Sequence, residues 1–212
     1  MTTYAQLSVS IDGYLAGPDP TIDDPLGRGG MGLHEWVFRL RAWRAAHGME
    51  GGEEGGPEAA LVEEIAPRTG AYVMGRKMFS GGSGPWQDDP MADGWWGDEP
   101  PFHAPVYVVT HHAREPLALD GGTTFFFVTD GVEQALDLAT EAAGDRDVQI
   151  AGGASVVQQV AALGRLDELM LHTAPIELGS GTKLFVDRAP RLEELERIET
   201  PHALHVRYRV VR

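Results

Sequence analysis

A pair of adjacent glycines stands at a point where the sequence changes from a strand pattern to a helix pattern. The apolar run Val148 to Ala151 is followed by Gly152 and Gly153, and a helical spacing starts near Ala154. Glycines let a backbone approach a phosphate closely, and the free N–H groups and positive dipole end of a following helix attract it. An isolated pair more often only permits a tight turn, so the junction needs a second observation.

A second glycine is followed by two cations at the end of another apolar run. Ala71 to Met74 is the run, and Gly75, Arg76 and Lys77 come directly after it. The chain has only 17 Lys and Arg, and ligands of α/β sheets gather at the carboxyl ends of the strands. The segment favours a phosphate site, although a solvent-exposed helix face accounts for the two cations equally well.

Charge and composition exclude several classes of function. Seventeen Lys and Arg against 32 Asp and Glu give a formal net charge of −15, which repels nucleic acid and anionic membrane surfaces. The absence of cysteine excludes disulfides, thiolate catalysis and iron–sulfur ligation. The N-terminus lacks a signal-peptide pattern, and no run approaches the roughly 18 apolar residues of a membrane span. We therefore expect a cytoplasmic protein without a nucleic-acid or membrane partner.

The elements that must position these glycines alternate along the chain. The length of 212 residues fits one domain, residues 1–212. Strands are predicted over 4–11, 71–74, 106–110, 124–129, 148–151, 168–174 and 204–211, and helices over 33–46, 58–65, 132–143 and 154–163. This alternation predicts an α/β fold with a mostly parallel central sheet, to which a C-terminal hairpin adds antiparallel strands.

Two segments are predicted as loops. Residues 48–57 are so rich in glycine that we expect a flexible surface loop without regular structure. Residues 79–105 form a long loop that contains Trp86, Trp95 and Trp96, and we interpret these three rings as a lid.

The histidine pairs do not predict a metal site. Neither His111 with His112 nor His202 with His205 has a third ligand at helical or hairpin spacing, so no metal is expected. Residues 179–183 lack the spacing of a nucleotide phosphate loop, and residues 81–85 lack the second glycine of a nucleophile elbow.

Five motifs in order resemble the dihydrofolate reductase-like superfamily, specifically the reductase domain of the bacterial riboflavin-biosynthesis deaminase-reductase and its stand-alone relatives. The resemblance covers nearly the whole chain. The motifs are residues 10–16 (SIDGYLA), 33–36 (LHEW), 72–78 (YVMGRKM), 148–156 (VQIAGGASV) and 174–185 (APIELGSGTKLF), with 108–111 (VVTH) between the third and fourth. The resemblance implies a three-layer α/β/α fold.

The resemblance also implies a site for NADPH or NADP+. It places the 2′-phosphate side at Gly75, Arg76 and Lys77, and Thr110 and His111 flank the same adenosine end. It places the pyrophosphate at Gly152, Gly153, Ala154, Ser155 and Val156, and the nicotinamide near Ser8, Leu15 and Ala16. The bond between Gly152 and Gly153 is expected to be cis.

The implied activity is hydride transfer from NADPH to a C=N or C=O carbon of a small heterocycle. The substrate is a pteridine or a pyrimidine of the 5-amino-6-(5-phosphoribosylamino)uracil type. Dihydrofolate reductases carry an acidic residue early in the helix after the first strand, and no residue here aligns with it. Glu35 is the candidate catalytic residue, while Asp23, Asp24 and a water stay open as proton donors.

Two further expectations accompany this activity. A non-catalytic NADP(H)-binding module is the alternative function, because the matching carboxylate is missing. Relatives are commonly dimers, so a homodimer is expected by analogy.

Overall fold

The computed structural model describes residues 1–186 and 189–211 in two compact units. Unit 1 comprises Met1–Ala5 and Arg68–Leu166, and unit 2 comprises Gln6–Pro67 and Asp167–Arg212. Strand β1 (Thr3–Ser10) contributes its first residues to unit 1 and the others to unit 2. The single domain expected for residues 1–212 stays a prediction.

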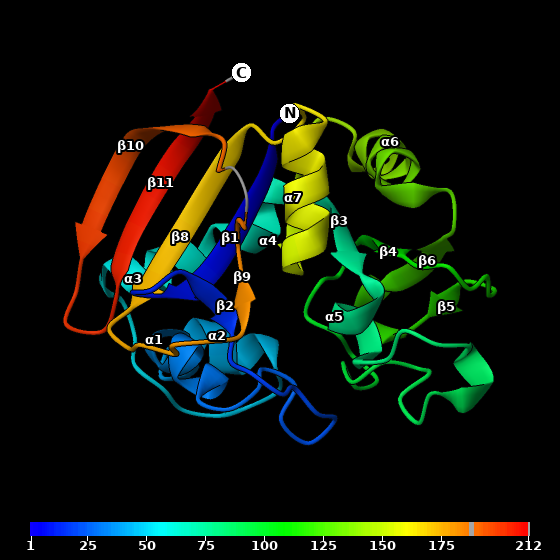
Figure 1. Cartoon of the computed structure of the whole chain (residues 1–212), viewed down its shortest axis with the longest axis horizontal. Helices are drawn as coiled ribbons and strands as arrows, with labels where there is room; N and C mark the ends of the chain where they lie inside the picture. Colours follow the sequence, from blue (N-terminus) through cyan, green and yellow to red (C-terminus); the bar gives the residue numbers. More distant parts are fainter. Residues whose placement is uncertain (187–188, 212) are drawn as a thin grey trace. The chain divides into compact units, whose positions relative to one another are not determined.

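Unit 1 is built on a mostly parallel sheet (Figure 1). Its strands follow the order β1, β7 (Asp147–Gly152), β3 (Thr69–Gly75), β4 (Pro105–Val109), β6 (Thr124–Val128) and β5 (Leu117–Ala118). All neighbouring pairs are parallel except β5 with β6. Strand β3 is buried at every position except its last, as expected for a strand inside a covered parallel sheet.

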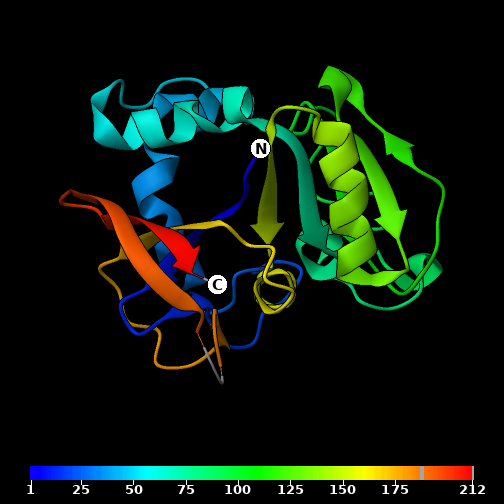
Figure 2. The ribbon, with the colours of Figure 1, turned by 90° about the horizontal axis from the view of Figure 1, so that it is seen from above.

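Two long helices pack on this sheet. Helix α6 (Gly131–Ala143) buries Val132, Ala135, Leu136, Ala139 and Ala143, which recur at helical spacing and form one face. Figure 2 shows α6 lying along the strands of unit 1. A Cβ atom on Gly70 would lie 2.6 Å from the carbonyl oxygen of Ala143, so the helix and β3 are too close for a side chain there. Helix α7 (Ala154–Ala162) packs on β7 and β3.

Unit 2 contains the antiparallel part of the fold. Its strand order is β10 (Arg191–Glu199), β11 (Leu204–Val211), β8 (Glu168–Ala174) and β1, and β11 pairs antiparallel with both β10 and β8. The predicted C-terminal hairpin is thus confirmed, and so is the α/β fold class with its mostly parallel sheet. A second, two-stranded sheet pairs β2 (Tyr14–Ala16) with β9 (Thr182–Lys183).

The single helix predicted over residues 33–46 is wrong. The segment forms a 3-10 turn, η1 (Gly30–His34), and two short helices, α1 (Glu35–Phe38) and α2 (Arg41–Ala46). Leu40 interrupts them with an extended backbone, φ −79° and ψ 134°. Glu53 bridges this interruption, since its N–H donates to Arg39 and its carbonyl accepts from Arg41. Long-range pairing therefore overrides the local helical spacing.

The same contact corrects the expectation for residues 48–57. Glu53 forms a one-residue β-bridge with Leu40, and Gly56 and Pro57 begin helix α3 (Gly56–Glu63), which is followed by α4 (Ile65–Arg68). Regular structure thus reaches into the glycine-rich segment from both sides. Among the described residues, no helix is long and apolar enough to cross a membrane.

The remaining elements are short. They are α5 (Arg76–Ser80), η2 (Trp86–Asp88) and η3 (Asp120–Gly122), and all three belong to unit 1.

Candidate functional site

The carboxyl ends of β7, β3 and β4 bring the two glycine segments of the sequence together in unit 1. Met74 pairs with Gly152 and Gly75 pairs with Val109 in the parallel register. A Cβ on Gly75 would lie 3.2 Å from Cγ2 of Val156 and 3.8 Å from the nitrogen of Gly153. Two motifs separated by more than 70 residues therefore form one edge, which we call the glycine edge. The Gly152–Gly153 bond is cis, as expected.

Different features of the structure explain why Gly152 and Gly153 are glycines. Gly152 has a φ of 137°, a conformation that other residues rarely adopt. Gly153 has a φ of −78°, and a Cβ there would meet nothing within 4 Å. The chain itself thus supplies no steric reason for a glycine at position 153, whereas a ligand that fills this space would.

Helix α7 begins at this edge with its backbone N–H groups available. Gly153 is the N-cap, no side chain caps the helix, and no acidic residue stands in the first turn. The N–H groups of Val156 and Val157 donate to the carbonyl of Gly153. The N–H groups of Ala154 and Ser155 precede them, at the positive end of the helix dipole. Ser155 is exposed, and its hydroxyl accepts a hydrogen bond from Gln159.

The two cations after Gly75 have different environments. Arg76 is buried, and its guanidinium donates to the hydroxyl of Ser80 and to the carboxylate of Asp89. It also lies 3.6 Å from the ring centroid of Trp86. Lys77 is exposed. Contact of Arg76 with a ligand phosphate stays a prediction, but within this chain its charge is already compensated, and Lys77 is the cation that faces solvent.

Asp89 completes a buried ion pair. Both its side chain and that of Arg76 are almost inaccessible, at 4% and 6%. Burial acts to raise the pKa of Asp89, but hydrogen bonds from Ser80, Arg76 and the N–H of Met91 outweigh it and lower the pKa below its usual value. The pair therefore holds two ionised groups inside unit 1.

The tryptophans of residues 79–105 pack against unit 1. The indole N–H of Trp86 donates a hydrogen bond of 2.7 Å to the carbonyl of His112, and the Trp86 ring lies edge-on to the ring of Phe127. Trp96 contacts Phe102 at 4.8 Å between centroids, and Trp95 lies against Gly81. These contacts favour a packing role over the predicted lid.

Thr110 and His111 follow the neighbouring strand β4. The N–H of Thr110 donates to Val128, and its hydroxyl accepts from the N–H of His112 at 3.1 Å. Thr110 is buried, and its side chain shapes the turn, while His111 is exposed.

Unit 2 holds the other residues predicted for the site. Ser8 is buried, and its hydroxyl accepts a hydrogen bond of 3.0 Å from the indole of Trp36. Leu15 and Ala16 are half-buried in β2. Glu35 is exposed at the start of α1. The burial that would favour a proton-donating Glu35 is therefore absent within unit 2.

The motifs at residues 10–16 and 174–185 also meet in unit 2. The carboxylate of Asp12 accepts from the N–H groups of Leu178 and Gly179, at 3.2 and 2.7 Å. A hydrogen bond with Ser10 and these backbone bonds lower the pKa of Asp12, against a smaller opposing effect of burial. This ionised carboxylate joins the turn after β1 to the loop after β8.

One buried cluster of unit 2 was not predicted from the sequence. We call it the histidine cluster. It contains Glu58, His172 and His205. The Nδ1 atoms of the two histidines are 2.7 Å apart, and Nε2 of His205 lies 3.2 Å from Oε1 of Glu58. The ring of Trp36 packs on both imidazoles, with centroids 4.3 and 4.9 Å away. The sequence signal was the apolar alternation of two strands, interrupted by one histidine in each.

Burial keeps the histidines of this region neutral. It lowers the pKa of His172 well below the usual value, and electrostatic interactions with His205, His34 and Arg207 act in the same direction. Burial also lowers the pKa of His205, against the opposing effect of Glu58. The pKa of His34 falls to about 4 for the same reason. Among residues 1–186 and 189–211, no group of three or more His, Cys, Asp or Glu side chains is arranged so that it could hold a metal ion.

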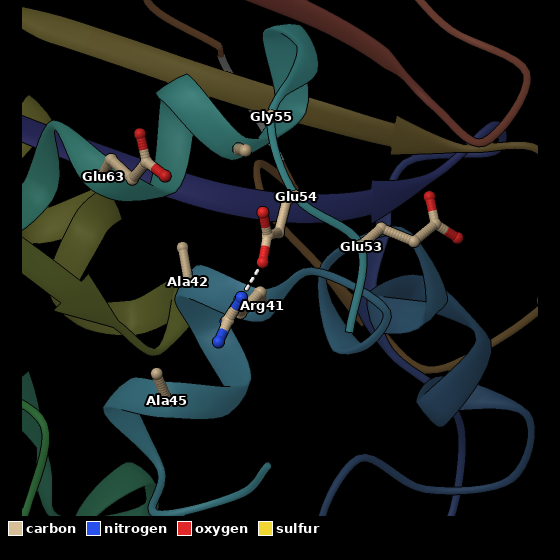
Figure 3. A pocket seen from close by; sticks show the side chains of 8 residues that line it. Arg41, Ala42, Ala45, Glu53, Glu54, Gly55 and Glu63 are labelled. Carbon is tan, nitrogen blue, oxygen red and sulfur yellow. Dashed lines mark ion pairs between the residues drawn. The ribbon is translucent and has the colours of Figure 1, made fainter. Parts of the chain in front are cut away.

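An open hollow of about 440 Å³ lies between α2 and α3 (Figure 3). Its lining residues are Arg41, Ala42, Ala45, Glu53, Glu54, Gly55, Ala59 and Glu63. Its one cation, Arg41, forms an ion pair with Glu54, drawn as the dashed line in Figure 3. The remaining lining is acidic or apolar and contains none of the predicted site residues. It does not suit a phosphate.

The parallel sheet with its glycine edge, together with the antiparallel C-terminal hairpin, defines an α/β protein of the dihydrofolate reductase-like class. The chain belongs to the RibD C-terminal domain family, whose model matches residues 2–203. No curated protein sequence matches the chain.

Solved structures with the same fold have low sequence identity. A protein of Shewanella sp. PV-4 assigned provisionally to riboflavin biosynthesis is 19% identical, with a TM-score of 0.62 and full coverage of both chains. A pyrimidine reductase-like protein of Corynebacterium diphtheriae is 15% identical, with a TM-score of 0.52, and the match covers all of this chain and 92% of that one.

A third structure is a larger protein. It is a diaminohydroxyphosphoribosylaminopyrimidine deaminase/5-amino-6-(5-phosphoribosylamino)uracil reductase of Thermotoga maritima, 13% identical with a TM-score of 0.56. The match covers 99% of this chain but only 56% of that one. At these identities the neighbours show the fold.

Proposed function

We propose that the chain is an NADPH-dependent reductase that transfers hydride to a C=N or C=O carbon of a small heterocycle, with a ribosylamino-pyrimidine of the riboflavin pathway as the substrate type. Membership of the RibD C-terminal domain family supports the reductase class. The observation that carries the proposal is the glycine edge, where Gly153 has room for a side chain that the sequence does not provide.

The residues of the glycine edge fit the phosphates of a dinucleotide. Backbone N–H groups of Ala154 and Ser155 at the start of α7 would hold the pyrophosphate, because a helix N-terminus without an acidic residue attracts anions. Lys77 is the exposed cation next to Gly75 and would pair with the 2′-phosphate. Arg76 would act indirectly, because its pairing with Asp89 fixes the first residue of α5 and therefore the start of the Lys77 side chain.

The residues predicted for the nicotinamide lie in unit 2. Ser8 is held by Trp36, so its hydroxyl and backbone have fixed positions from which they could orient a carboxamide. Leu15 and Ala16 belong to β2, which pairs with β9 and is thereby fixed as well. These groups would bind and orient, while bound NADPH supplies the hydride. The heteroatom of the reduced C=N or C=O bond must then receive one proton.

A non-catalytic NADP(H)-binding module is the alternative. The exposure of Glu35 favours it, because the carboxylate expected to donate the proton faces solvent in unit 2. In that case the glycine edge would still bind the cofactor, but no substrate would be reduced.

Two measurements on the full chain separate these functions. Titration with NADPH and NADH, followed by nicotinamide fluorescence, should give tighter binding of NADPH. Absorbance at the nicotinamide band is then followed with 5-amino-6-(5-phosphoribosylamino)uracil and dihydropterins. Oxidation of NADPH that depends on one of these substrates supports the reductase, and tight binding without oxidation under all of them supports the alternative. Equal affinity for both cofactors would contradict the 2′-phosphate site.

We expect the chain to act in the cytoplasm, to bind a small-molecule substrate and to form a homodimer. These expectations rest on the family analogy and on the net charge of −15. Light scattering on the purified chain tests the homodimer.

A further inference from the structure

The histidine cluster is assembled by strand register. His172 on β8 and His205 on β11 are directly opposite each other in the antiparallel pairing, so their side chains emerge on the same face. Trp36 of α1 packs on that face, and Glu58 reaches it from the first turn of α3. His172, His205 and Glu58 are 2%, 0% and 6% exposed. Three titratable groups therefore share one dry interior.

The hydrogen bonds determine where the protons lie. The hydroxyl of Thr200 lies 2.6 Å from Oε1 of Glu58 and 3.1 Å from the carbonyl oxygen of Ala203. Its single proton goes to the nearer of the two, so Oε1 of Glu58 acts as an acceptor. Nε2 of His205 must then carry a proton toward Glu58, and its Nδ1 must accept from Nδ1–H of His172. This tautomer leaves Nε2 of His172 without a proton. That atom is buried and has no hydrogen-bond partner in the described structure.

We propose that Glu58, His205 and His172 form a proton relay whose outlet is Nε2 of His172, and that this relay supplies the proton that accompanies hydride transfer. The second part rests on the proposed reductase function. The first part concerns the chain alone and can be tested without any ligand.

The relay loads by three proton shifts. A proton binds to Nε2 of His172, the proton on Nδ1 of His172 moves to Nδ1 of His205, and the proton on Nε2 of His205 moves to the carboxylate of Glu58. Both imidazoles end neutral with reversed tautomers, and Glu58 ends as a carboxylic acid. Delivery from Nε2 of His172 reverses all three shifts and restores the carboxylate, so one proton enters and one leaves.

Burial favours this path over a charged histidine. The loaded cluster contains no ionised group, whereas an imidazolium on either ring would add a second buried charge beside the carboxylate of Glu58, at a large desolvation cost. The lowered pKa values of both histidines agree with that cost.

Among the described residues, two further titratable groups act on His172. Arg207 on β11 is one, and it is already paired with Glu64, Glu168 and Glu196. His34 of η1 is the other, and its Nδ1 is also buried without a hydrogen-bond partner. Its lowered pKa keeps it neutral near pH 7, so neither group adds an uncompensated charge.

Trp36 connects the relay with the predicted nicotinamide residues of unit 2. Its ring packs on His172, and its indole N–H donates to Ser8. The outlet ring is therefore separated from Ser8 by a single side chain. His34 precedes Glu35 and Trp36, so the exposed candidate acid and the relay meet at the same short segment.

The relay is tested by nitrogen NMR of the histidine rings in the full chain across the pH range in which it stays folded. The expected result is a reversal of the tautomers of His172 and His205 as the pH falls, with neither ring becoming an imidazolium. In Glu58→Gln the reversal should disappear, because the amide cannot take up the proton. Glu63→Gln is the matched control, on the same helix but exposed, and should keep the reversal. Fixed tautomers in the wild type, or an imidazolium signal from either ring, would overturn the relay.

Delivery is tested separately by turnover. Glu58→Gln should lower kcat at least tenfold and change its pH profile, with the dissociation constant of NADPH unchanged, whereas Glu63→Gln should match the wild type. A reversal of tautomers in a chain that does not bind NADPH would refute the proposed function but retain the relay. Normal kcat and pH profile in Glu58→Gln would refute delivery while the reductase stands.

Discussion

The glycine edge of unit 1 and the histidine cluster of unit 2 are built in opposite ways. The edge uses residues contiguous in sequence, Gly75 to Lys77 and Gly152 to Val156, which two neighbouring parallel strands place side by side. The cluster uses single residues from three distant elements, brought together by register and helix packing. The edge presents backbone groups to solvent, whereas the cluster hides side chains from it. Binding of an anion and storage of a proton call for these opposite environments.

The buried ion pair of Arg76 and Asp89 adjoins the glycine edge, because Arg76 directly follows Gly75. Breaking this pair is expected to have the largest effect on the free energy of unfolding. Arg76→Met leaves Asp89 as an uncompensated buried carboxylate and should lower the free energy of unfolding by about 3–5 kcal/mol. Denaturant-induced unfolding of the full chain measures this loss of unfolding free energy. Arg114→Met is the control, because the partner of Arg114, Asp93, is mostly exposed. Equal losses in the two variants would show that burial of the pair does not matter.

The contrast between edge and cluster also explains what the sequence could predict. The strand at 168–174 was predicted with the bounds that the structure shows, and the helix at 154–163 and the strand at 148–151 within one residue at each end, because apolar periodicity and the glycine pair mark them locally. The hairpin was predicted without bounds for β10, because residues 191–199 are mostly charged and exposed, and only pairing with β11 makes them a strand.

The candidate site was likewise predictable only where local sequence patterns mark its residues. The meeting of Gly75 with Gly153 follows from the rule that the carboxyl ends of parallel strands share an edge. The pairing of Arg76 with Asp89 did not follow, because the loop at 79–105 has no periodicity that places Asp89. The histidine cluster requires the register of β8 against β11, which local patterns do not determine.

The pH dependence of stability tests the dry interior around the cluster. The pKa of His34 is lowered from 6.5 to about 4, so below pH 6.5 the unfolded chain binds a proton that the folded chain refuses. The contribution of His34 to the free energy of unfolding is therefore greatest above pH 6.5. It falls by up to about 3 kcal/mol between pH 6.5 and 4.

The measurement is the free energy of unfolding at several pH values for the wild type and His34→Gln. The variant should show a shallower loss between pH 6.5 and 4, and His202→Gln, which removes an exposed histidine, should not. Parallel curves for the wild type and His34→Gln would contradict burial of a neutral imidazole.

The open space at Gly153 predicts a variant that folds but does not bind. Gly153→Val places its Cβ where no atom beyond the two neighbouring residues lies within 4 Å, in the space assigned to the pyrophosphate. NADPH should bind at least about a hundredfold more weakly, a loss near 2.7 kcal/mol. Gly84→Val is the control, because that position also has free space and lies outside the edge. Far-ultraviolet circular dichroism verifies folding of both, and a folded Gly153→Val with normal affinity would remove the cofactor assignment.

The smallest expected effect separates the two adjacent cations. Lys77→Ala removes an exposed charge that the chain does not bury, so stability should stay within about 0.5 kcal/mol of the wild type. A charge-assisted hydrogen bond to a phosphate contributes about 1.5–3 kcal/mol, so NADPH should bind about ten- to a hundredfold more weakly. NADH, which lacks the 2′-phosphate, should bind as before. If instead both cofactors were unaffected, the phosphate would have to be held by backbone alone or by Arg76 after release from Asp89. Comparison with Arg76→Met distinguishes these cases, because only the second predicts that a folded Arg76→Met loses selectivity for NADPH while Lys77→Ala keeps it.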